Sequence, residues 1–362
     1  FPICIAWSTP DGQIKNGDQP IILSAGVQND GPKPLEETAE NQGIPIKRWR
    51  MKPGVNLTES WNILQWAKGE GVDVLHSHGY KFNILIGIFP NLVRKIPLVT
   101  TVHGYTAAKP YSAMWFYQLV DQWLVNKMQK VVFVSKVTEK LGCFSGLTGN
   151  QKTVIYNGIM EEGDQLLYKS KNWSKFLEGT SKENSDVLLA VGRLSPEKGL
   201  FVLLDAFSQL SKENERLKLV LFGEGPLRAA LEEKIVALDI QSKVALPGYV
   251  DDIESWMACS ACLAMPSFSE GMPITLLEAI RCGVRVVASN VGGIPELLSG
   301  NKKATLVRSG DVTELADAIK TALEVPRNDD TLDVSLYQEF TKNHMVSRYS
   351  ALYRDMLFAQ QR

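Results

Sequence analysis

The amino-acid sequence predicts an α/β protein made of two doubly wound domains. Short apolar runs alternate with longer amphipathic stretches along most of the 362 residues, the pattern of parallel strands joined by crossover helices. A polar stretch at residues 161–186 separates two such series. The composition is 44% hydrophobic and 22% charged, which is that of a globular chain long enough for two domains.

The first series defines a predicted N-terminal Rossmann-like domain over residues 1–160. Its short apolar runs predict strands, and its longer runs with helical spacing predict helices. Strands are expected at 1–7, 45–51, 72–78, 97–104, 130–135 and 152–158, and helices at 59–71, 81–93 and 114–129.

The second series defines a predicted C-terminal domain over residues 161–335. A last segment, 336–362, is expected to be mostly one long helix. Within the second domain, strands are expected at 187–193, 217–225, 243–249, 261–267, 285–289 and 304–308, and helices at 200–214, 227–240, 252–260, 273–283, 293–300 and 311–325.

Charge and cysteine content exclude several classes of protein. A net charge of −1 and a pI near 6.5 give no basic footprint, so we expect no nucleic-acid partner. Five scattered cysteines do not form a disulfide framework and fit a reducing compartment, so a cytoplasmic protein is expected. The pair Cys259 and Cys262 is interpreted as core, because no second pair completes a zinc site.

Two cations follow one predicted strand. Arg193 leaves the strand at 187–193, and Lys198 stands at the start of the next helix. A cation is disfavoured at a helix N-terminus, so the pair indicates an anion between them, and a diphosphate is the natural candidate. Ligands of doubly wound sheets bind outside the carboxyl ends of the strands, where both residues lie. The plain alternative is a pair of solvent-exposed charges.

A second predicted anion site lies in "SFSEGMPITLLEA" (267–279). A helix beginning at Pro273 offers free backbone N–H groups at its start. Glu270 precedes that start, and Glu278 lies about 8 Å into the helix at 1.5 Å per residue. Carboxylates accept hydrogen bonds from vicinal hydroxyls, so one could hold a ribose and the other a sugar. The ligand that fits is a nucleotide sugar.

Gly223 and Gly225 form a weaker signal. They flank a strand end at which the chain could approach a ligand closely. The dinucleotide fingerprint fails because Arg228 occupies the third glycine position. A tight turn between strand and helix explains the pair nearly as well.

Two further features leave alternatives open. His76, His78 and His103 lie at neighbouring strand ends, so a three-histidine metal site is one interpretation, although no metal is expected. The helix at 114–129 has apolar residues at 116, 119, 120, 123 and 124. A core-facing stripe is preferred for it, and contact with a membrane surface, aided by the basic run at 46–52, is the alternative.

Together, "VGRLSPEKGL", "GEGPL" and "PSFSEGMPITLLEAIRCGVRVVASNVGGIPELL" resemble the retaining glycosyltransferases of family four, which have the GT-B fold. The resemblance extends from Val72 onward and is densest over 187–307. It implies two Rossmann-like domains facing a cleft, no cofactor, and transfer of a sugar from a nucleotide-diphosphate sugar to a glycan, lipid-linked or small-molecule acceptor. Polysaccharide or envelope-glycan synthesis at the cytoplasmic side, with peripheral contact at the inner membrane face, is the implied setting.

The resemblance also implies roles for individual residues. Arg193 and Lys198 would bind the diphosphate, Glu278 the ribose, and Glu270 the transferred sugar, with His103 beside the anomeric carbon. The backbone of Gly271, Met272, Pro273, Ile274 and Thr275 would contact phosphate and sugar. Gly223, Tyr249 and Val250 would complete the donor site near the base. The tail would cross back to the N-terminal domain.

One departure from the family is expected. The run at 1–7 matches the family's second strand, so the N-terminal domain is predicted to lack its first β-α unit, with activity reduced or lost as a result. Three alternatives to a transferase follow: an epimerase of nucleotide sugars on the same fold, a metal-dependent hydrolase using His76, His78 and His103, and a nucleotide-sugar binder without activity.

Overall fold

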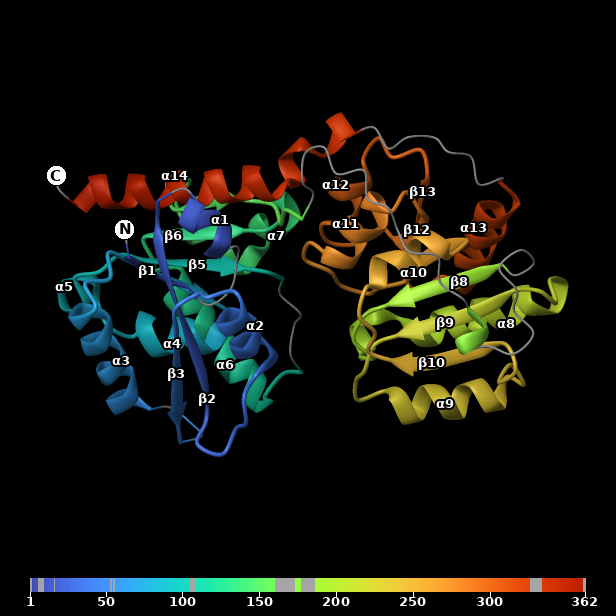
Figure 1. The fold of residues 1–362 in the computed structure, drawn as a ribbon, viewed down its shortest axis with the longest axis horizontal. Coiled ribbons are helices and arrows are strands. Elements are labelled where there is room, and N and C mark those ends of the chain that lie inside the picture. Colours follow the sequence, from blue (N-terminus) through green and yellow to red (C-terminus); the bar gives the residue numbers. More distant parts are fainter. Residues whose placement is uncertain are drawn as a thin grey trace. The chain divides into compact units, whose positions relative to one another are not determined.

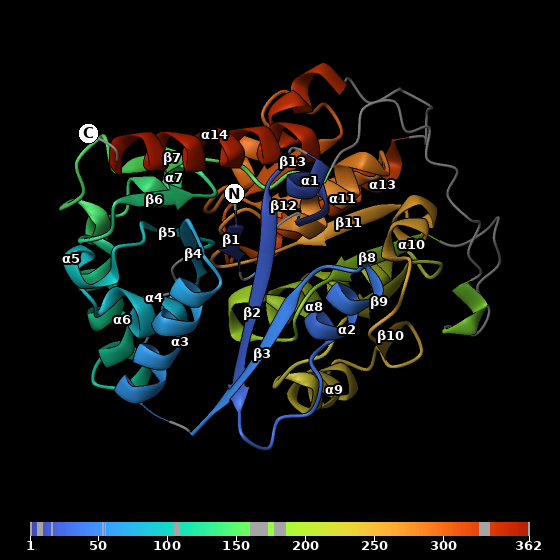
Figure 2. The same cartoon turned by 60° about the vertical axis from the view of Figure 1, so that its left-hand side comes forward.

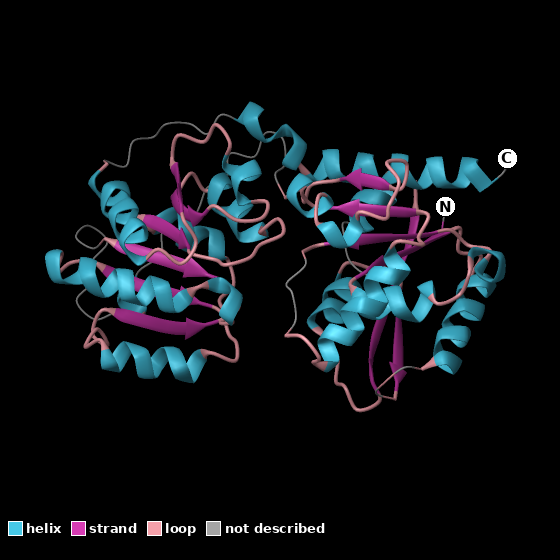
Figure 3. Ribbon diagram, turned by 180° about the vertical axis from the view of Figure 1, so that it is seen from behind, coloured by secondary structure: helices cyan, strands magenta, loops and turns pink. Residues whose placement is uncertain are grey.

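The computed structural model describes residues 2–5, 10–15, 17–52, 54, 56–104, 109–159, 173–176, 186–325 and 334–360. The chain divides into two compact units. The first comprises Phe1–Gly158 with Glu339–Arg362, and the second comprises Ile159–Gln338. Each unit is a parallel sheet between layers of helices (Figures 1 and 3).

The first unit contains a seven-stranded parallel sheet in the order β3-β2-β1-β4-β5-β6-β7. This is the doubly wound order, extended by one strand. Its strands are β1 (Pro2–Ile5), β2 (Gln19–Val27), β3 (Ile46–Met51), β4 (Val74–His78), β5 (Leu98–Val102), β6 (Lys130–Phe133) and β7 (Lys152–Val154).

β1 lies inside this sheet, between β2 and β4. Ile3 is in register with Pro20 of β2 on one side and with Val74 of β4 on the other, and α1 (Pro10–Lys15) connects β1 to β2. The prediction that the first β-α unit is missing is therefore wrong. It fails because it overlooks β2, whose start at Gln19 and Pro20 follows Gly17 and so resembles a turn in the sequence.

Helices cover both faces of this sheet. Successive strand residues point to opposite faces, so Leu98 joins the core under α3, α4 and α6, whereas Val99 joins the core under α14. Figure 2 shows α3 to α6 grouped on one side and α14 running along the other. The helices are α2 (Pro34–Asn41), α3 (Leu57–Gly69), α4 (Tyr80–Gly87), α5 (Asn91–Arg94), α6 (Ala113–Val125), α7 (Lys136–Glu139), η1 (Gly142–Phe144) and α14 (Lys342–Gln360).

The second unit contains a six-stranded parallel sheet in the order β10-β9-β8-β11-β12-β13. The order reverses between β8 and β11, which is where such sheets bind ligands. The strands are β8 (Val187–Val191), β9 (Lys218–Phe222), β10 (Val244–Gly248), β11 (Cys262–Met265), β12 (Arg285–Ser289) and β13 (Ala304–Val307).

One large core holds this unit together. It joins apolar side chains of α8 and α13 to β8, β9, β11 and β12, and Cys262 belongs to it. The helices are η2 (Trp173–Lys175), η3 (Pro196–Lys198), α8 (Leu200–Glu213), α9 (Arg228–Ala237), α10 (Ile253–Cys259), α11 (Ile274–Arg281), α12 (Ile294–Leu298), α13 (Val312–Glu324) and η4 (Val334–Phe340).

The apolar stripe of helix α6 was predicted to face the core, and the structure shows that this prediction is wrong. Of the five apolar positions predicted to face the core, only Leu124 is buried, whereas Phe116, Leu119, Val120 and Trp123 are exposed. The side that packs inward is formed instead by Asp121, Leu124 and Val125. Across the described residues, no helix combines the length and the apolar character that crossing a membrane requires.

Candidate active site

The candidate site of the second unit lies at the carboxyl ends of β8 and β11, on either side of the point where the strand order reverses. Gly192 and Arg193 leave β8, and the loop 266–273 leaves β11. Parallel strands bring their carboxyl ends to one edge of a sheet, so two segments far apart in sequence meet there.

Glycines allow these loops to approach one another. Gly223 has φ +131°, and a Cβ on it would lie 2.0 Å from the carbonyl oxygen of Gly192. Gly292 has φ +55°, and a Cβ there would lie 1.7 Å from the carbonyl oxygen of Glu270. Any larger residue would push Glu270 or the turn after β8 away, because both contacts are with backbone.

Lys198 and Glu270 form an ion pair across the site. The Lys198 ammonium lies 2.6 Å from Oε1 of Glu270, and the Ser267 hydroxyl donates to the same oxygen at 2.7 Å. Only 9% of the Glu270 side chain and 24% of the Lys198 side chain are exposed. The two predicted anion-binding segments therefore contact each other directly, and Lys198 is partly neutralised.

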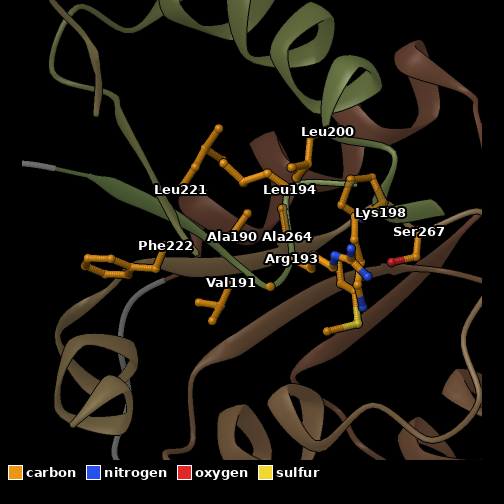
Figure 4. Close-up of a pocket in the computed structure, with 13 residues that line it drawn as sticks. Ala190, Val191, Arg193, Leu194, Lys198, Leu200, Leu221, Phe222, Ala264 and Ser267 are labelled. Carbon is orange, nitrogen blue, oxygen red and sulfur yellow. The ribbon is translucent and has the colours of Figure 1, made fainter. Parts of the chain in front are cut away.

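Arg193 is the second cation of the site, and its charge helps to lower the pKa of the Glu197 carboxyl group. Its side chain is exposed, and its guanidinium has neither a hydrogen-bond acceptor nor an ion-pair partner in the part of the chain that the structure describes. Figure 4 shows a small pocket between the ends of β8 and β11, which is distinct from the larger cavity described below. In it, Arg193 lies beside Lys198, with Ser267 close by, at the end away from Phe222. An arginine kept unpaired between a cation and a glycine turn is suited to a multiply charged oxyanion.

A cavity of about 480 Å³ adjoins Arg193. That is the size of a small-molecule binding site. It brings together five of the predicted donor-site residues, which come from four different loops or helices. Its lining is Val191, Gly192, Arg193, Phe222, Gly223, Glu224, Tyr249, Val250, Ile253 and Glu278.

The start of α11 differs by one residue from the prediction. Pro273 is the N-cap, with φ −72° and ψ 119°, and the helix begins at Ile274. An extended ψ places Pro273 outside the helix, whereas the prediction put it at the first helical position. Within the described chain, the amides of Ile274 and Thr275 have no acceptor, so both remain available to an anion. Met272 beneath them is buried.

Glu278 points into the cavity from α11 and is only partly exposed. Burial raises the pKa of this carboxyl group, the nearby charge of Glu254 raises it further, and Arg281 opposes the shift. Arg281 is itself bonded to Glu254, with Nε 2.8 Å from Oε1. Tyr249, at the cavity rim, is 81% exposed and so presents a ring for a planar ligand to stack on.

Gly192, Glu224 and Ser267 are among the residues of this site for which the sequence analysis predicted no role. Gly192 and Glu224 line the cavity, and Ser267 holds Glu270. Signals for each exist in the sequence, since Gly192 immediately precedes Arg193, Glu224 stands between Gly223 and Gly225, and Ser267 ends a strand. None of these residue types is distinctive, so the signals become meaningful only with the strand order.

The three histidines cluster at the carboxyl ends of β4 and β5 in the first unit. His78 Nδ1 lies 2.8 Å from His103 Nε2, and the rings of His76 and His78 are 4.2 Å apart. His76 is buried and hydrogen-bonded on both ring nitrogens, to Tyr353 at 2.7 Å and Thr101 at 2.8 Å. Since neither His76 nitrogen is free, a three-histidine metal site is not supported by this geometry.

Burial also sets the charge of this cluster. It lowers the pKa of His76 to about 3, with the neighbouring His103 adding to the shift. Burial lowers the pKa of His78 well below its usual range as well. Both rings are therefore neutral at pH 7, and one nitrogen of the His78–His103 pair must donate to the other. Such a contact fixes the orientation of His103.

Comparison with known proteins adds to this geometry. The sequence model of "Glycosyl transferases group 1" matches residues 171–343, and that of "Glycosyltransferase Family 4" matches residues 11–162. The chain is 26% identical to N-acetyl-alpha-D-glucosaminyl L-malate synthase of Bacillus anthracis, over 84% of this chain and 80% of that protein.

Two further proteins are similar. The chain is 26% identical to the UDP-Gal:alpha-D-GlcNAc-diphosphoundecaprenol alpha-1,3-galactosyltransferase of Escherichia coli, over 71% of this chain and 68% of that protein. The structure of Anabaena Alr3699/HepE in complex with UDP and glucose superposes with a TM-score of 0.77 at 21% identity, over 98% of this chain and 99% of that one. The shared fold is thus present along nearly the whole chain.

Proposed function

The chain belongs to the group 1, family 4 glycosyltransferases, and from that premise we propose that it transfers a sugar, with retention of configuration, from a nucleoside-diphosphate sugar bound in its second unit. The observation that carries the proposal is the guanidinium of Arg193, unpaired among the residues that the structure describes, beside the Lys198–Glu270 ion pair and a cavity of about 480 Å³. UDP and glucose in the Anabaena protein agree with a donor of this class.

In the proposed complex, the diphosphate lies between Arg193 and the free amides at the start of α11. Glu278 faces the cavity and would accept hydrogen bonds from the ribose hydroxyls. Tyr249, Val250 and Gly223 would enclose the base. Gly271 leads into the turn of Met272 and Pro273, so the backbone of this turn, with the amides of Ile274 and Thr275, would contact phosphate and sugar.

The proposed chemistry follows from charge. As the glycosidic bond breaks, the electron pair goes to the diphosphate oxygen, and negative charge grows there. Arg193 and the amides of α11 would stabilise that charge, the largest catalytic contribution expected. Glu270 already accepts two hydrogen bonds, so it suits positioning the sugar better than attacking it. The acceptor hydroxyl would attack the anomeric carbon on the same face as the leaving group and pass its proton to the departing diphosphate oxygen, which would give retention. His103 would hydrogen-bond to the sugar.

The acceptor is proposed to be a glycan or a lipid-linked sugar in glycan synthesis. The galactosyltransferase of Escherichia coli acts, by its name, on a diphosphoundecaprenol-linked sugar. A cytoplasmic protein with peripheral contact at the membrane would meet such an acceptor.

The test is nucleotide binding to the whole chain. We expect UDP, or another nucleoside diphosphate in a panel, to raise the melting temperature, because a ligand that binds only the folded state stabilises it. Arg193→Ala should weaken that binding by about tenfold to a hundredfold, the effect of losing a charge-assisted hydrogen bond. Arg308→Ala, an exposed arginine elsewhere in the unit, is the control. Equal affinity in Arg193→Ala would refute the phosphate assignment.

Retention is tested separately. With donor and acceptor supplied, the anomeric configuration of the product is read by NMR. An α-linked donor should give an α-linked product, and a β-linked product would overturn the proposed geometry of attack. An isomerised free sugar formed without acceptor would instead show an epimerase.

A further inference from the structure

Helix α6 carries an apolar stripe that faces solvent. Phe116, Leu119, Val120 and Trp123 follow the i, i+3, i+4, i+7 spacing of a core-facing helix. They are nevertheless exposed by 54%, 42%, 45% and 58%. The opposite side of α6 is the one packed in the unit, where Asp121 accepts a hydrogen bond from Asn83 at 2.7 Å. We call these four exposed side chains the α6 stripe.

The α6 stripe is not interrupted by charge. Every exposed residue of the helix is apolar or aromatic, since Ala113, Met114 and Tyr117 complete the set. A single exposed apolar residue is ordinary on a protein surface, whereas a continuous stripe over two turns marks a binding surface. Asp121, the acid within the helix, is buried and lies on the packed side of α6.

Lysines bracket the stripe. Residues 109–127 contain two lysines, Lys109 and Lys127, and one acid, the buried Asp121. Lys109 lies before the helix and Lys127 just after it. The Lys127 ammonium lies 3.4 Å from the centre of the Trp123 ring, so a positive charge is held at the edge of the apolar surface.

The basic run at residues 46–52 contributes less than the sequence suggests. Arg48 lies 2.5 Å from Glu40, and Arg50 lies 2.7 Å from Glu36, so both guanidinium groups are already paired within the unit. The positive charge that a contact places at the α6 stripe is that of Lys127.

From this arrangement we infer that α6 docks on an anionic lipid surface, with the α6 stripe in the boundary between headgroups and acyl chains and the lysines on the lipid phosphates. An apolar face carrying Trp and Phe and flanked by lysine is typical of helices that lie in the plane of a membrane. A second copy packed against the same face through a two-fold axis would bring like-charged lysines together, so charge favours the lipid. The inference deepens the proposed function. It rests on that function in one respect, namely that the acceptor is a lipid-linked sugar in the membrane.

The experiment is co-sedimentation of the full chain with vesicles of phosphatidylcholine, with and without phosphatidylglycerol. The variant carries Phe116→Ser and Trp123→Ser, and its matched control carries Val236→Ser and Phe358→Ser, two apolar residues exposed elsewhere. We expect the parent chain and the control to bind vesicles that contain phosphatidylglycerol, and the α6 variant to bind them at least about tenfold more weakly. Lys127→Gln should weaken binding to the anionic vesicles about fivefold and leave the neutral vesicles unaffected.

Three results would overturn the inference. The first is a parent chain that fails to bind anionic vesicles, and the second is an α6 variant that binds them as tightly as the parent chain does. In the third result, the parent chain self-associates and binds no vesicles, and the α6 variant abolishes the self-association; the α6 stripe would then contact a second copy. The UDP-induced rise in melting temperature is measured on the same samples. A variant that loses vesicles but keeps that rise separates failure of docking from failure of the donor site.

Discussion

At the residue scale, Glu270 is the group whose role the structure most constrains. Its Oε1 already accepts from Lys198 and Ser267, so the carboxylate both holds the lysine and faces the proposed sugar site. Glu270→Gln keeps the shape and removes the charge that neutralises Lys198. We expect nucleotide affinity to be kept or increased, while turnover falls by about a hundredfold because the sugar is no longer positioned.

Two measurements check this expectation. Calorimetric titration with the nucleoside diphosphate gives the affinity, and slow hydrolysis of the bound nucleotide sugar gives turnover without any acceptor. Parental turnover in Glu270→Gln would remove this carboxylate from the mechanism. Ser267→Ala is a useful companion, because it loses one hydrogen bond to Glu270 and keeps the charge.

Glu278 shows the cost of the site to stability. Burial raises the pKa of this carboxyl group, which means that the folded state holds its ionised form less favourably than the unfolded state does. Stability from this group is therefore present at low pH and lost as the pH rises through the folded-state pKa. We expect Glu278→Gln to raise the melting temperature at pH 7 and to weaken nucleotide binding about tenfold. An unchanged melting temperature together with unchanged affinity would contradict both parts.

At the element scale, the turn before α12 keeps the β11 loop in place. Gly292→Ala would put a methyl group 1.7 Å from the Glu270 carbonyl oxygen, at a φ of +55°. Gly283→Ala is a matched control, because its φ is +66° but its only near atom is Lys303 Nζ at 3.8 Å. Backbone strain should cost each variant roughly 1 kcal/mol of stability, and the clash with the Glu270 backbone should destabilise Gly292→Ala further. Only Gly292→Ala should also lose nucleotide-sugar turnover, as followed by release of the nucleoside diphosphate. Equal turnover in the two variants would show that the contact with Glu270 is unimportant.

The elements also show what a single sequence can predict. Buried parallel strands such as β8 and β11 are found because each is a short apolar run, and the start of α11 is found to within one residue because Pro273 marks it. β2 is missed because Gly17 and Pro20 look like a turn. The outward side of α6 is missed because helical spacing indicates an apolar face and does not say what covers it.

At the scale of the whole molecule, the sequence predicts the site's residues better than their contacts. Strand ends point to Arg193, Glu270 and Glu278, because ligands of doubly wound sheets gather there. The Lys198–Glu270 ion pair joins residues 72 positions apart and depends on β8 and β11 being neighbours, which the chain order alone does not give. The hydrogen bond between His76 and Tyr353 likewise depends on α14 packing against the first sheet.

The division into two units, each with its own core, leads to the last expectation. In the first unit, burial lowers the pKa of His76 to about 3, and His78 shifts in the same direction. Between pH 6.5 and 3, the unfolded chain binds a proton that the folded His76 ring does not, so this histidine should lower the free energy of unfolding by about 1.4 kcal/mol per pH unit as the pH falls, and His78 acts in the same direction. A nucleoside diphosphate should act on the second unit instead. Calorimetry at pH 7 and pH 5, with and without UDP, should therefore show one unfolding transition whose temperature acid lowers and another whose temperature the nucleotide raises.

Two histidine variants test the assignment. His76→Gln should reduce the effect of acid, and His344→Gln, at an exposed position on α14, should leave it unchanged. The expectation fails if acid lowers both transitions alike, or if the dependence on pH is the same in His76→Gln as in the parent chain.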